Sequence, residues 1–600
     1  MNSSENINKN EMNKKSSTMR LIAYMKPYAH WVIFALLLVL GLTAFDLYRP
    51  MLVGDAIDTF GANGDYDVII ATAIKYAVVL ALSFAFNIAQ TWILQKTGQN
   101  IILQMRKDLY RHIQSLGSRY FDITPVGKLV TRVTNDVEAL NEMYSGILVQ
   151  LFRNIVKIVG LAGVMLVLDV RLAAISFVLM PLVIGLTVLC QKIARNIYRL
   201  YRTRLTDINT FLSEHLSGMK IIQIFGRQER KFEEFHDKNT KLYKAFYREM
   251  LMYAVFRPLI YILSILSLMI VLWFGSRNVF DEIISVGTLY IFSNYIRSFF
   301  DPIQELAEQF STLQSSIASA EKIFTVMDEE EFIPEVENPK QPDVKPEIVS
   351  PADPAPVNIL GEIEFRHVWF AYDGENYVLK DVSFVINPGE KVAFVGATGA
   401  GKSSILNLIG RYYDIQKGHI YIDGIDIRQL SKKQLRSAIG QMQQDVFIFE
   451  GDVAYNIRLN DNDITDEQVK EAAEYVNASH FIEKLPQGYH EPVTERGATF
   501  SAGERQLLSF ARTLAHNPSI LVMDEATANI DTETEILIQE ALEKLMDGRT
   551  TIMVAHRLST IQHADCIMVM HKGRICESGT HRELLEQDGI YRKLYELQIS

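Results

Sequence analysis

Residues 396–404 read Gly-Ala-Thr-Gly-Ala-Gly-Lys-Ser-Ser, and this stretch decides how the second half of the chain is expected to fold. It matches the pattern G-x-x-x-x-G-K-S/T, with the motif glycines at Gly396 and Gly401. An apolar run, 392–395, precedes it and a helix-like run, 404–409, follows it, so we expect a strand, a glycine loop and a helix. Loop N–H groups and the positive end of that helix would face one point, which suits a phosphate group.

The residues of this loop are therefore candidates for binding the phosphates of ATP. Lys402 is expected to reach the β- and γ-phosphates, and the Ser403 hydroxyl is expected to ligate Mg²⁺. A glycine turn that binds nothing is the alternative for so short a motif. The candidate ligand-binding residues in the loop are Gly396, Thr398, Gly399, Ala400, Gly401, Lys402, Ser403 and Ser404.

Two acidic residues follow a second apolar run. Asp524 and Glu525 come directly after residues 520–523, whose composition is typical of a buried parallel strand. We expect Asp524 to orient Mg²⁺ and its waters, and Glu525 to polarise the water that attacks the γ-phosphate. His556 follows another apolar run, 553–555, in the same way.

The first half of the chain is apolar enough to cross a membrane several times. Six hundred residues exceed what a single core supports, and the mean hydropathy is slightly positive. Six apolar runs approach the roughly 20 residues that a helix needs to cross a bilayer. These runs lie near residues 31–53, 69–94, 146–168, 172–192, 255–275 and 283–305.

The distribution of charge predicts how these spans are oriented. The segment before the first span and residues 96–145 are rich in Lys and Arg, whereas residues 54–68 contain neither and hold four Asp. By the positive-inside rule, we expect a multi-pass protein of the cytoplasmic membrane with both termini in the cytoplasm. No cleavable signal peptide is expected, because the first apolar run is of spanning length.

Composition divides the chain into four segments. Residues 1–16 should be disordered, and 17–328 should form a transmembrane domain with six spans and two long cytoplasmic extensions. Residues 329–357 hold seven of the seventeen prolines, which is typical of an extended linker. Residues 358–600 should form an α/β domain.

Charge and cysteine usage exclude some classes of function. Residues 358–600 carry 24 Lys and Arg against 36 Asp and Glu, so this acidic half is not expected to bind nucleic acid. The three cysteines, Cys190, Cys566 and Cys576, lack CxxC spacing. Neither a disulfide nor a zinc site is therefore expected.

Taken in order, these motifs resemble those of a half-transporter of the ATP-binding-cassette (ABC) exporter type, from about residue 20 to the C-terminus. The resemblance implies an all-α membrane domain of six helices in a domain-swapped dimer, joined to a cytoplasmic α/β P-loop nucleotide-binding domain. It also implies roles for further residues: Tyr372 would stack on adenine, Gln444 would sense Mg²⁺ and the attacking water, and His556 would contact the γ-phosphate.

Other segments resemble the parts of this family that join subunits and domains. Asp531 matches the loop that crosses to the partner nucleotide domain, and Glu495-Arg496-Gly497 matches a segment that meets the membrane helices. Residues 120–136 and 213–225 resemble the two coupling segments that transmit motion between the domains.

One motif departs from the family pattern. Where Leu-Ser-Gly-Gly-Gln is usual, residues 500–504 read Phe-Ser-Ala-Gly-Glu. Ser501 and Gly503 are retained and would cap ATP held by the opposite subunit. Ala502 adds a methyl group and Glu504 a carboxylate near the phosphates, which predicts a weaker closing surface. Harmless drift, with Glu504 in solvent, is the alternative.

This asymmetry resembles heterodimeric ABC exporters. We expect this chain to supply the catalytic glutamate and to pair with a second half-transporter that carries the usual signature. The predicted function is ATP-driven export of small hydrophobic or amphipathic compounds, with the lipid bilayer and a small-molecule substrate as its other partners. The alternatives are a regulatory or channel-like ABC protein and an importer built on the exporter fold.

Ionisable residues inside the predicted spans form two pairs. Asp46 and Arg49 are three residues apart, and Arg297 and Asp301 are four apart, so each pair shares a helix face. A local ion pair near the membrane surface is favoured over a polar substrate path, because both pairs lie toward the ends of their spans.

Overall fold

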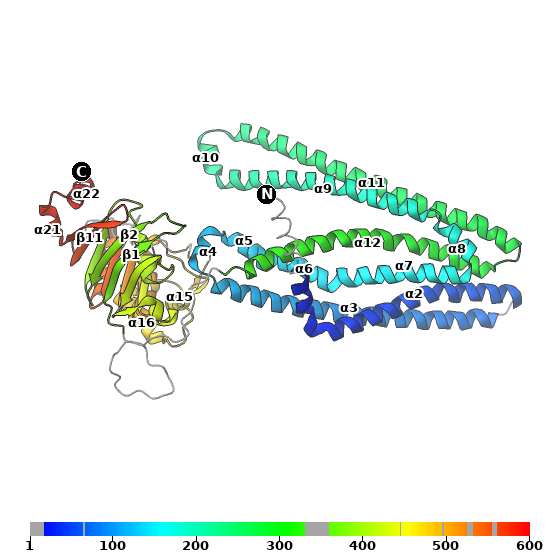
Figure 1. Cartoon of the computed structure of the whole chain (residues 1–600), viewed down its shortest axis with the longest axis horizontal. Helices are drawn as coiled ribbons and strands as arrows, with labels where there is room; N and C mark the ends of the chain where they lie inside the picture. Colours follow the sequence, from blue (N-terminus) through cyan, green and yellow to red (C-terminus); the bar gives the residue numbers. More distant parts are fainter. Residues whose placement is uncertain are drawn as a thin grey trace, which may run out of the picture. The chain divides into compact units, whose positions relative to one another are not determined.

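The computed structural model describes residues 17–63, 66–330, 359–443, 446–494, 497, 499–524, 532–554 and 561–599. These residues form two compact units. Unit 1 comprises Met1–Gln114 and Val126–Glu329, and unit 2 comprises Ser115–Pro125 and Glu330–Ser600. Helices build the described part of unit 1, and strands occur in unit 2 (Figure 1).

Unit 1 is built from long helices with short connections. Between α5 and α7 the chain stays helical through two π-helical stretches, η2 and η3. The elements are η1 (Lys26–Tyr28), α2 (Ala29–Asn63), α3 (Tyr66–Ser115), α5 (Val126–Thr131), η2 (Arg132–Asp136), α6 (Val137–Glu142), η3 (Met143–Ile147), α7 (Leu148–Leu168), α8 (Val170–Phe177), α9 (Met180–Ser217), α10 (Met219–Ile224), α11 (Gln228–Phe280) and α12 (Val286–Met327).

Five helical segments among the described residues are long and apolar enough to cross a membrane. They are Ser17–Gly61, Tyr66–Ser115, Val126–Leu168, Val170–Ser217 and Gln228–Phe280. Many of their apolar side chains point outward, as expected of a surface that lipid covers. The sixth predicted span falls on α12, which is long enough but carries Arg297, Asp301 and Glu305, so this span stays a prediction.

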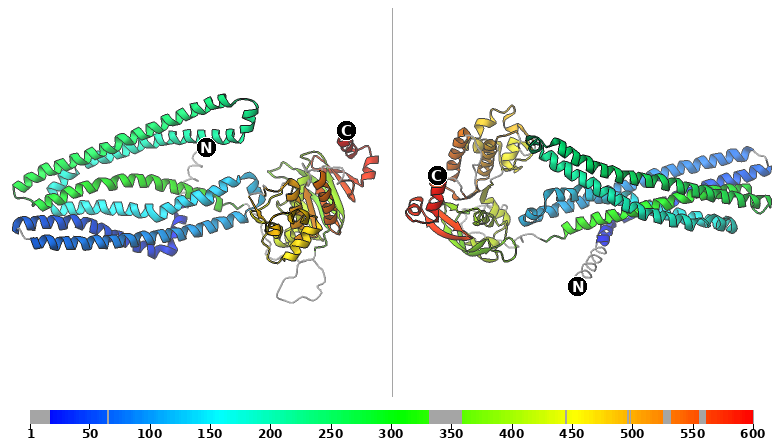
Figure 2. Two further views of the ribbon diagram at one scale, coloured as in Figure 1. Left: turned by 180° about the vertical axis from the view of Figure 1, so that it is seen from behind. Right: turned by 90° about the horizontal axis from the view of Figure 1, so that it is seen from above.

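Helix α12 is the centre of unit 1. Tyr295 on α12 is 1% exposed and donates a hydrogen bond of 2.6 Å to the backbone oxygen of Leu47 on α2. The two helices also approach closely at Gly54 and Gly287, where a Cβ atom on Gly287 would collide with the Gly54 carbonyl oxygen. Small residues at such crossings let membrane helices pack backbone to backbone. Helices α9 and α11 lie side by side as a long hairpin (Figures 1 and 2).

The two predicted pairs of charged residues in the spans differ from each other in the structure. Asp46 does pair with Arg49, and it also accepts a hydrogen bond of 3.3 Å from Arg153 on α7, so the pair is part of a link between helices. The predicted local pair is therefore present, and Arg153 extends it to a second helix. Within the described residues no ion pair joins Arg297 to Asp301, and both side chains are exposed. Charges inside membrane domains commonly bridge helices or face a polar cavity.

Unit 2 contains two main sheets. The four-stranded sheet has the order β2-β1-β4-β5, and the six-stranded sheet has the order β12-β11-β3-β10-β9-β6. In the larger sheet only β12 is antiparallel to its neighbour. The strands are β1 (Ile363–Phe370), β2 (Leu379–Ile386), β3 (Lys391–Val395), β4 (Lys417–Ile422), β5 (Ile425–Asp426), β6 (Ile439–Met442), β7 (Gly451–Asp452), β8 (Pro492–Val493), β9 (Ile520–Asp524), β10 (Thr550–Val554), β11 (Cys566–His571) and β12 (Arg574–Gly579).

The helices of unit 2 are short, and several begin with a side-chain cap. Capping boxes open α14, α16, α18 and α21. The helical elements are α4 (Ser118–Ile123), α13 (Lys402–Ile409), η4 (Ile427–Gln429), α14 (Lys432–Ser437), α15 (Val453–Arg458), α16 (Asp466–Tyr475), α17 (Ser479–Ile482), η5 (Gly488–His490), α18 (Ala502–Ala515), α19 (Thr532–Met546), α21 (His581–Glu586) and α22 (Ile590–Ile599).

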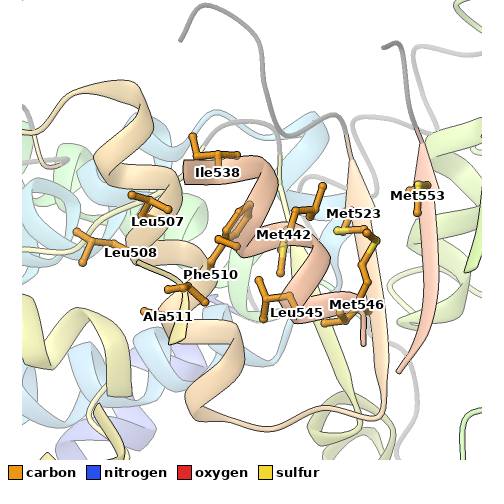
Figure 3. Packing of buried hydrophobic residues seen from close by; sticks show 14 of the residues in the cluster. Met442, Leu507, Leu508, Phe510, Ala511, Met523, Ile538, Leu545, Met546 and Met553 are labelled. Carbon is orange, nitrogen blue, oxygen red and sulfur yellow. The ribbon is translucent and has the colours of Figure 1, made fainter. Parts of the chain in front are cut away.

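A methionine-rich core fixes the helices against one face of the larger sheet. Met442, Met523 and Met553 come from β6, β9 and β10 and belong to one buried cluster with Phe510 of α18 and Leu545 of α19 (Figure 3). Phe510 is fully buried. This packing holds α18 and α19 against β6, β9 and β10, and the ends of these strands carry the candidate site.

Candidate functional site

Four strands of the larger sheet end at the same edge. The register pairs Val554 at the end of β10 with Phe394 of β3 on one side and with Asp524 of β9 on the other. Met442 at the end of β6 pairs with Met523. In open α/β sheets, ligands bind outside the carboxyl ends of the strands. The segments that follow these four strands carry the loop at 396–404, Gln444, Glu525 and His556.

The loop after β3 needs its glycines. Gly396 has φ +153° and Gly401 has φ +104°, conformations that residues with a Cβ atom rarely adopt. A Cβ on Gly396 would collide with the Met570 carbonyl oxygen, and one on Gly401 would lie 2.7 Å from a methyl carbon of Leu379. Close packing against β11 and β2 therefore requires glycine at both positions, as the motif predicts.

Lys402 is held at this loop. It is the first residue of α13 and is 6% exposed. Its Nζ donates hydrogen bonds to the carbonyl oxygens of Gly396 at 2.7 Å and Ala397 at 3.2 Å. The ammonium group therefore lies in the turn of the loop, where it can exchange a carbonyl partner for a phosphate oxygen. Ser403 beside it is exposed.

Two of the described residues could ligate a Mg²⁺ ion that is bound to a nucleotide. Within the described residues no group of three or more His, Cys, Asp or Glu side chains converges on one point. Mg²⁺ bound to a nucleotide keeps several waters and needs only one or two protein ligands besides the phosphates. The exposed Ser403 hydroxyl and the half-buried Asp524 carboxylate, at the end of β9, fit that need.

An aromatic cluster connects Tyr372 to the loop. The Tyr372 hydroxyl lies 3.0 Å from the Ser404 hydroxyl, so the ring is tied to α13. Its ring packs edge-on against Tyr413, with centroids 5.0 Å apart, and against Phe370 at 4.7 Å. The cluster positions Tyr372, predicted to stack on adenine, next to the predicted phosphate loop.

Sequence reasoning missed Tyr413. Its hydroxyl donates a hydrogen bond to the carboxylate of Asp122 on α4, and burial together with that bond raises its pKa. Arg119 on α4 pairs with Asp373 at 2.9 Å. The first part of the predicted coupling segment 120–136 thus belongs to unit 2 and contacts the residues around Tyr372. A tyrosine directly after the helix of a phosphate loop was the available signal.

The second predicted coupling segment lies in unit 1. It covers the end of α9 and α10, and its apolar residues Ile221, Ile224 and Phe225 are exposed, Phe225 at 72%. It exposes an apolar tip. Among the described residues no ion pair involves this segment, whereas Arg119 beside the first segment pairs with Asp373.

The signature segment begins a helix. Ser501 is the N-cap of α18: its hydroxyl accepts a hydrogen bond from the Glu504 N–H at 3.2 Å, and the Glu504 carboxylate accepts one from the Ser501 N–H at 2.7 Å. Glu504 is half-buried and holds the start of α18, and its predicted position near the phosphates of the opposite subunit stays a prediction. Its carboxylate closes a capping box, a role that glutamine can also fill. Ala502 is exposed, Gly503 is buried, and Phe500 packs against Phe481.

Several predicted residues lie outside the described residues. These are Gln444, Glu495, Arg496, Glu525, Asp531 and His556. The described strands β6, β9 and β10 end one or two residues before Gln444, Glu525 and His556, and they end at one edge of the sheet. The roles of these residues stay predictions.

Comparisons with known proteins agree with this arrangement. Residues 32–303 match the family described as "ABC transporter transmembrane region", and residues 379–528 match the family "ABC transporter". The chain is 41% identical over 581 residues to the ABC transporter ATP-binding protein exp8 of Streptococcus pneumoniae, which spans 96% of this chain and 97% of that protein.

Two further proteins extend the comparison. The multidrug resistance ABC transporter ATP-binding/permease protein YheH of Bacillus subtilis is 40% identical over 526 residues, which spans 87% of this chain and 76% of that protein. The solved structure of a bacterial Atm1-family ABC exporter with ATP bound superposes with a TM-score of 0.76 at 25% identity, over 95% of this chain and 98% of that one.

Proposed function

The chain belongs to the ABC transporter family, and we propose that it forms one half of a dimeric exporter of small hydrophobic or amphipathic compounds. A transmembrane region followed by an ATP-binding domain makes it an ABC exporter, and ABC exporters are ATPases coupled to transport that act as dimers. The predicted fold class is confirmed: a helical membrane domain and an α/β nucleotide-binding domain.

The observation that carries the proposal is the shared edge of four strands. The loop with Lys402 follows β3 at this edge, Asp524 ends β9 there, and β6 and β10 also end there, which supports the proposed roles of Gln444, Glu525 and His556. Phosphoryl transfer needs such convergence, because catalysis depends on positioning and on charges aimed at the γ-phosphate.

Each group then has a defined part in hydrolysis. Lys402 leaves its carbonyl partners to neutralise the β- and γ-phosphate oxygens, while the N–H groups of the loop and of α13 bind the remaining oxygens. Ser403 and Asp524 hold Mg²⁺, which offsets negative charge on the phosphates. Glu525 takes a proton from the attacking water, and His556 and Gln444 orient that water and the γ-phosphate.

Coupling to the membrane runs through α4. Its Asp122 and Arg119 contact Tyr413 and Asp373, which flank Tyr372. Since α3 and α5 continue from α4 on either side, closure around ATP would pull on both helices. ATP binding favours one conformation of the membrane helices and hydrolysis releases it, as population shifts require.

The membrane is the cytoplasmic membrane, with both termini inside. Lys and Arg are concentrated before the first span and in residues 96–145, which supports this orientation. The multidrug name of the relative YheH and the apolar interior of unit 1 support a hydrophobic or amphipathic cargo.

The partner is a second half-transporter. We propose that Ser501 and Gly503 cap the nucleotide of the partner subunit, which supplies a usual signature in return. The capping box of Glu504 favours a second candidate, a homodimer, because it gives this glutamate a structural role. Full substrate-stimulated ATPase activity of the purified chain alone would refute obligate pairing; activity only with the half-transporter encoded beside it would support pairing.

Replacing Glu525 with Gln tests the function itself. We expect ATP hydrolysis to fall by about 10²-fold or more, the scale of a lost general base, while ATP binding persists. Glu543→Gln on the exposed side of α19 is the matched control and should hydrolyse normally. Unchanged turnover in Glu525→Gln would contradict the proposal. ATP-independent flux in vesicles would favour a channel, and ATP-driven uptake into cells would favour an importer.

A further inference from the structure

Arg512 joins two parts of unit 2 that lie next to predicted site residues. It belongs to α18, the helix that begins after the N-cap Ser501. Its Nε donates a hydrogen bond of 2.8 Å to the carbonyl oxygen of Asn456, and its Nη1 donates one of 3.1 Å to the carbonyl oxygen of Phe447. Its Nη2 donates one of 3.3 Å to the Asn456 Oδ1. One side chain therefore connects α18 both to α15 and to the segment that follows β6.

Asn456 on α15 holds the same segment from the other side. It is fully buried. Its Oδ1 accepts a hydrogen bond of 2.8 Å from the Phe449 N–H, and its Nδ2 donates hydrogen bonds to the carbonyl oxygens of Phe449 at 2.8 Å and Asp452 at 3.0 Å. One amide therefore satisfies both backbone groups of Phe449. We call Arg512 and Asn456 together the α18 clamp.

The Arg512 guanidinium is not held in place by an opposite charge. No carboxylate among the described residues forms an ion pair with it, and burial lowers the pKa of the guanidinium. Burying a cation without an anionic partner costs free energy, so stability alone does not explain an arginine at this position. Arginine supplies a planar fork of donors that reaches two chain segments at once, which a lysine ammonium cannot do.

The clamp fixes one end of a short segment. Met442, at the end of β6, is 2% exposed and pairs with β9, so the chain is anchored before the segment. Ile448 is fully buried in the same core, and the clamp holds the backbone on either side of it. Gln444 lies between these two anchors, two residues after Met442 and four before Ile448. The reach of so short a chain is limited by the positions of its ends.

We propose that Arg512 and Asn456 are positioning residues for ATP hydrolysis: they set the far end of the segment that carries Gln444 and so tie the placement of this glutamine to α18. The inference rests on the proposed function, in which Gln444 orients the attacking water. A misplacement of about 1 Å in such a group can lower a rate by about 10²-fold, so the anchors of its segment matter. Since α18 begins beside Ser501, a shift of this helix against a second subunit would reach Gln444 through the clamp.

Arg512→Lys tests the clamp. It keeps the positive charge, but one ammonium group cannot bond to Phe447 and Asn456 in the same way. In the full chain, with its partner subunit where assembly requires one, we expect kcat for ATP hydrolysis to fall by about tenfold. The KM for ATP should stay within about twofold, because the phosphate loop is unchanged. Asn456→Ser, which removes the bonds to Phe449, should act in the same direction. Normal kcat in both variants would overturn the proposal.

Arg549 provides a matched control in the same unit. Its guanidinium also donates three hydrogen bonds, to the carbonyl oxygens of Pro518 at 3.1 Å and Leu545 at 2.9 Å and to the Oδ1 of Asn517 at 3.1 Å. Pro518 and Asn517 precede β9, away from the sheet edge that carries the candidate site. Arg549→Lys should therefore lower the melting temperature about as much as Arg512→Lys does, but leave kcat unchanged. A comparable loss of kcat in both variants would show a structural role only and overturn the proposal.

A double-mutant cycle shows whether the clamp acts through Gln444. Gln444→Ala alone should lower kcat, and adding Arg512→Lys should then change kcat by less than about twofold, because residues that act on one step are not additive. Two losses that multiply would overturn the proposal.

The cycle also separates this inference from the proposed function. If Glu525→Gln and Gln444→Ala both lower kcat but the loss from Arg512→Lys multiplies with that from Gln444→Ala, the proposed function stands and only the role of the clamp fails. If Gln444→Ala hydrolyses ATP normally, the part proposed for this glutamine fails, and the role of the clamp fails with it.

Discussion

The edge of the sheet in unit 2 and the apolar groove between α7, α9 and α12 in unit 1 are specified in opposite ways. At the sheet edge, the conformation of the backbone determines the site. Gly396 and Gly401 adopt φ angles that residues with a Cβ atom rarely adopt, and Lys402 donates hydrogen bonds to carbonyl oxygens of its own loop. In the groove, apolar residues of α7, α9 and α12 form most of the lining, and Thr187 and Gln191 are the polar residues among the described lining. A phosphate site tolerates little variation, whereas an alkyl chain needs only length and apolarity.

The largest expected effect separates the two regions. Lys402→Ala should lower ATP hydrolysis by about 10²-fold or more, the scale of losing one group that stabilises developing charge. Binding of an amphipathic compound to unit 1 without nucleotide should remain. Lys470→Ala, on the exposed side of α16, is the control. Normal ATP hydrolysis by Lys402→Ala in a steady-state assay would contradict the role proposed for the phosphate loop.

The second largest effect is expected from changing the backbone-constrained Gly396 at the sheet edge. Gly396→Ala should destabilise unit 2 by about 1 to 3 kcal/mol, because of its φ and the collision with the Met570 carbonyl. Gly374→Ala, which also has positive φ but open space around it, should cost less. Denaturant unfolding of the two variants measures the difference. Equal losses would show that the close contact contributes nothing.

The scaffold of unit 2 should respond to acid. Burial alone would raise the pKa of Asp426, but hydrogen bonds from Arg428 and His419 outweigh it and lower the pKa from 3.8 to about 2. A lowered pKa stabilises the fold above the unfolded value, and that contribution disappears as the pH falls from about 4 toward 2. Asp426→Asn should therefore be less stable than the wild type at pH 7, with the gap narrowing below pH 4 in thermal melts. A constant gap across this range would contradict the assignment.

The smallest effect concerns the membrane unit. Asp46→Asn weakens the links to Arg49 and Arg153, and polar contacts between membrane helices contribute only about 0.6 kcal/mol on average. We expect a slight loss in thermal stability in detergent and normal ATP hydrolysis. A loss of ATP-driven flux with normal stability would instead place this charge on the substrate path.

The difference between the regions explains what the sequence could predict. The phosphate loop and the strand before Asp524 were predicted residue by residue, because each motif encodes its own local backbone. Tyr413 was missed because its role depends on packing against Tyr372 and on Asp122, almost 300 positions away in the chain. The capping role of Glu504 was not predicted because only its charge was considered, although S-x-x-E is the pattern of a capping box.

The membrane unit was predictable only as a set of spans. Their apolar lengths follow from composition, but which faces meet depends on the packing of α12 against α2 and α7. The link from Asp46 to Arg153 and the apolar groove both arise where helices meet. The sequence pattern of a single helix therefore does not predict either feature.

The central claim is that ATP hydrolysed at the sheet edge drives an amphiphile through the membrane unit. Its most direct test is ATP-dependent movement of a labelled amphiphile in sealed vesicles that contain the wild type or Glu525→Gln. The account predicts movement in the wild type only, with ATP hydrolysis lowered by about 10²-fold or more in Glu525→Gln. Equal ATP-dependent movement in the wild type and Glu525→Gln would contradict it.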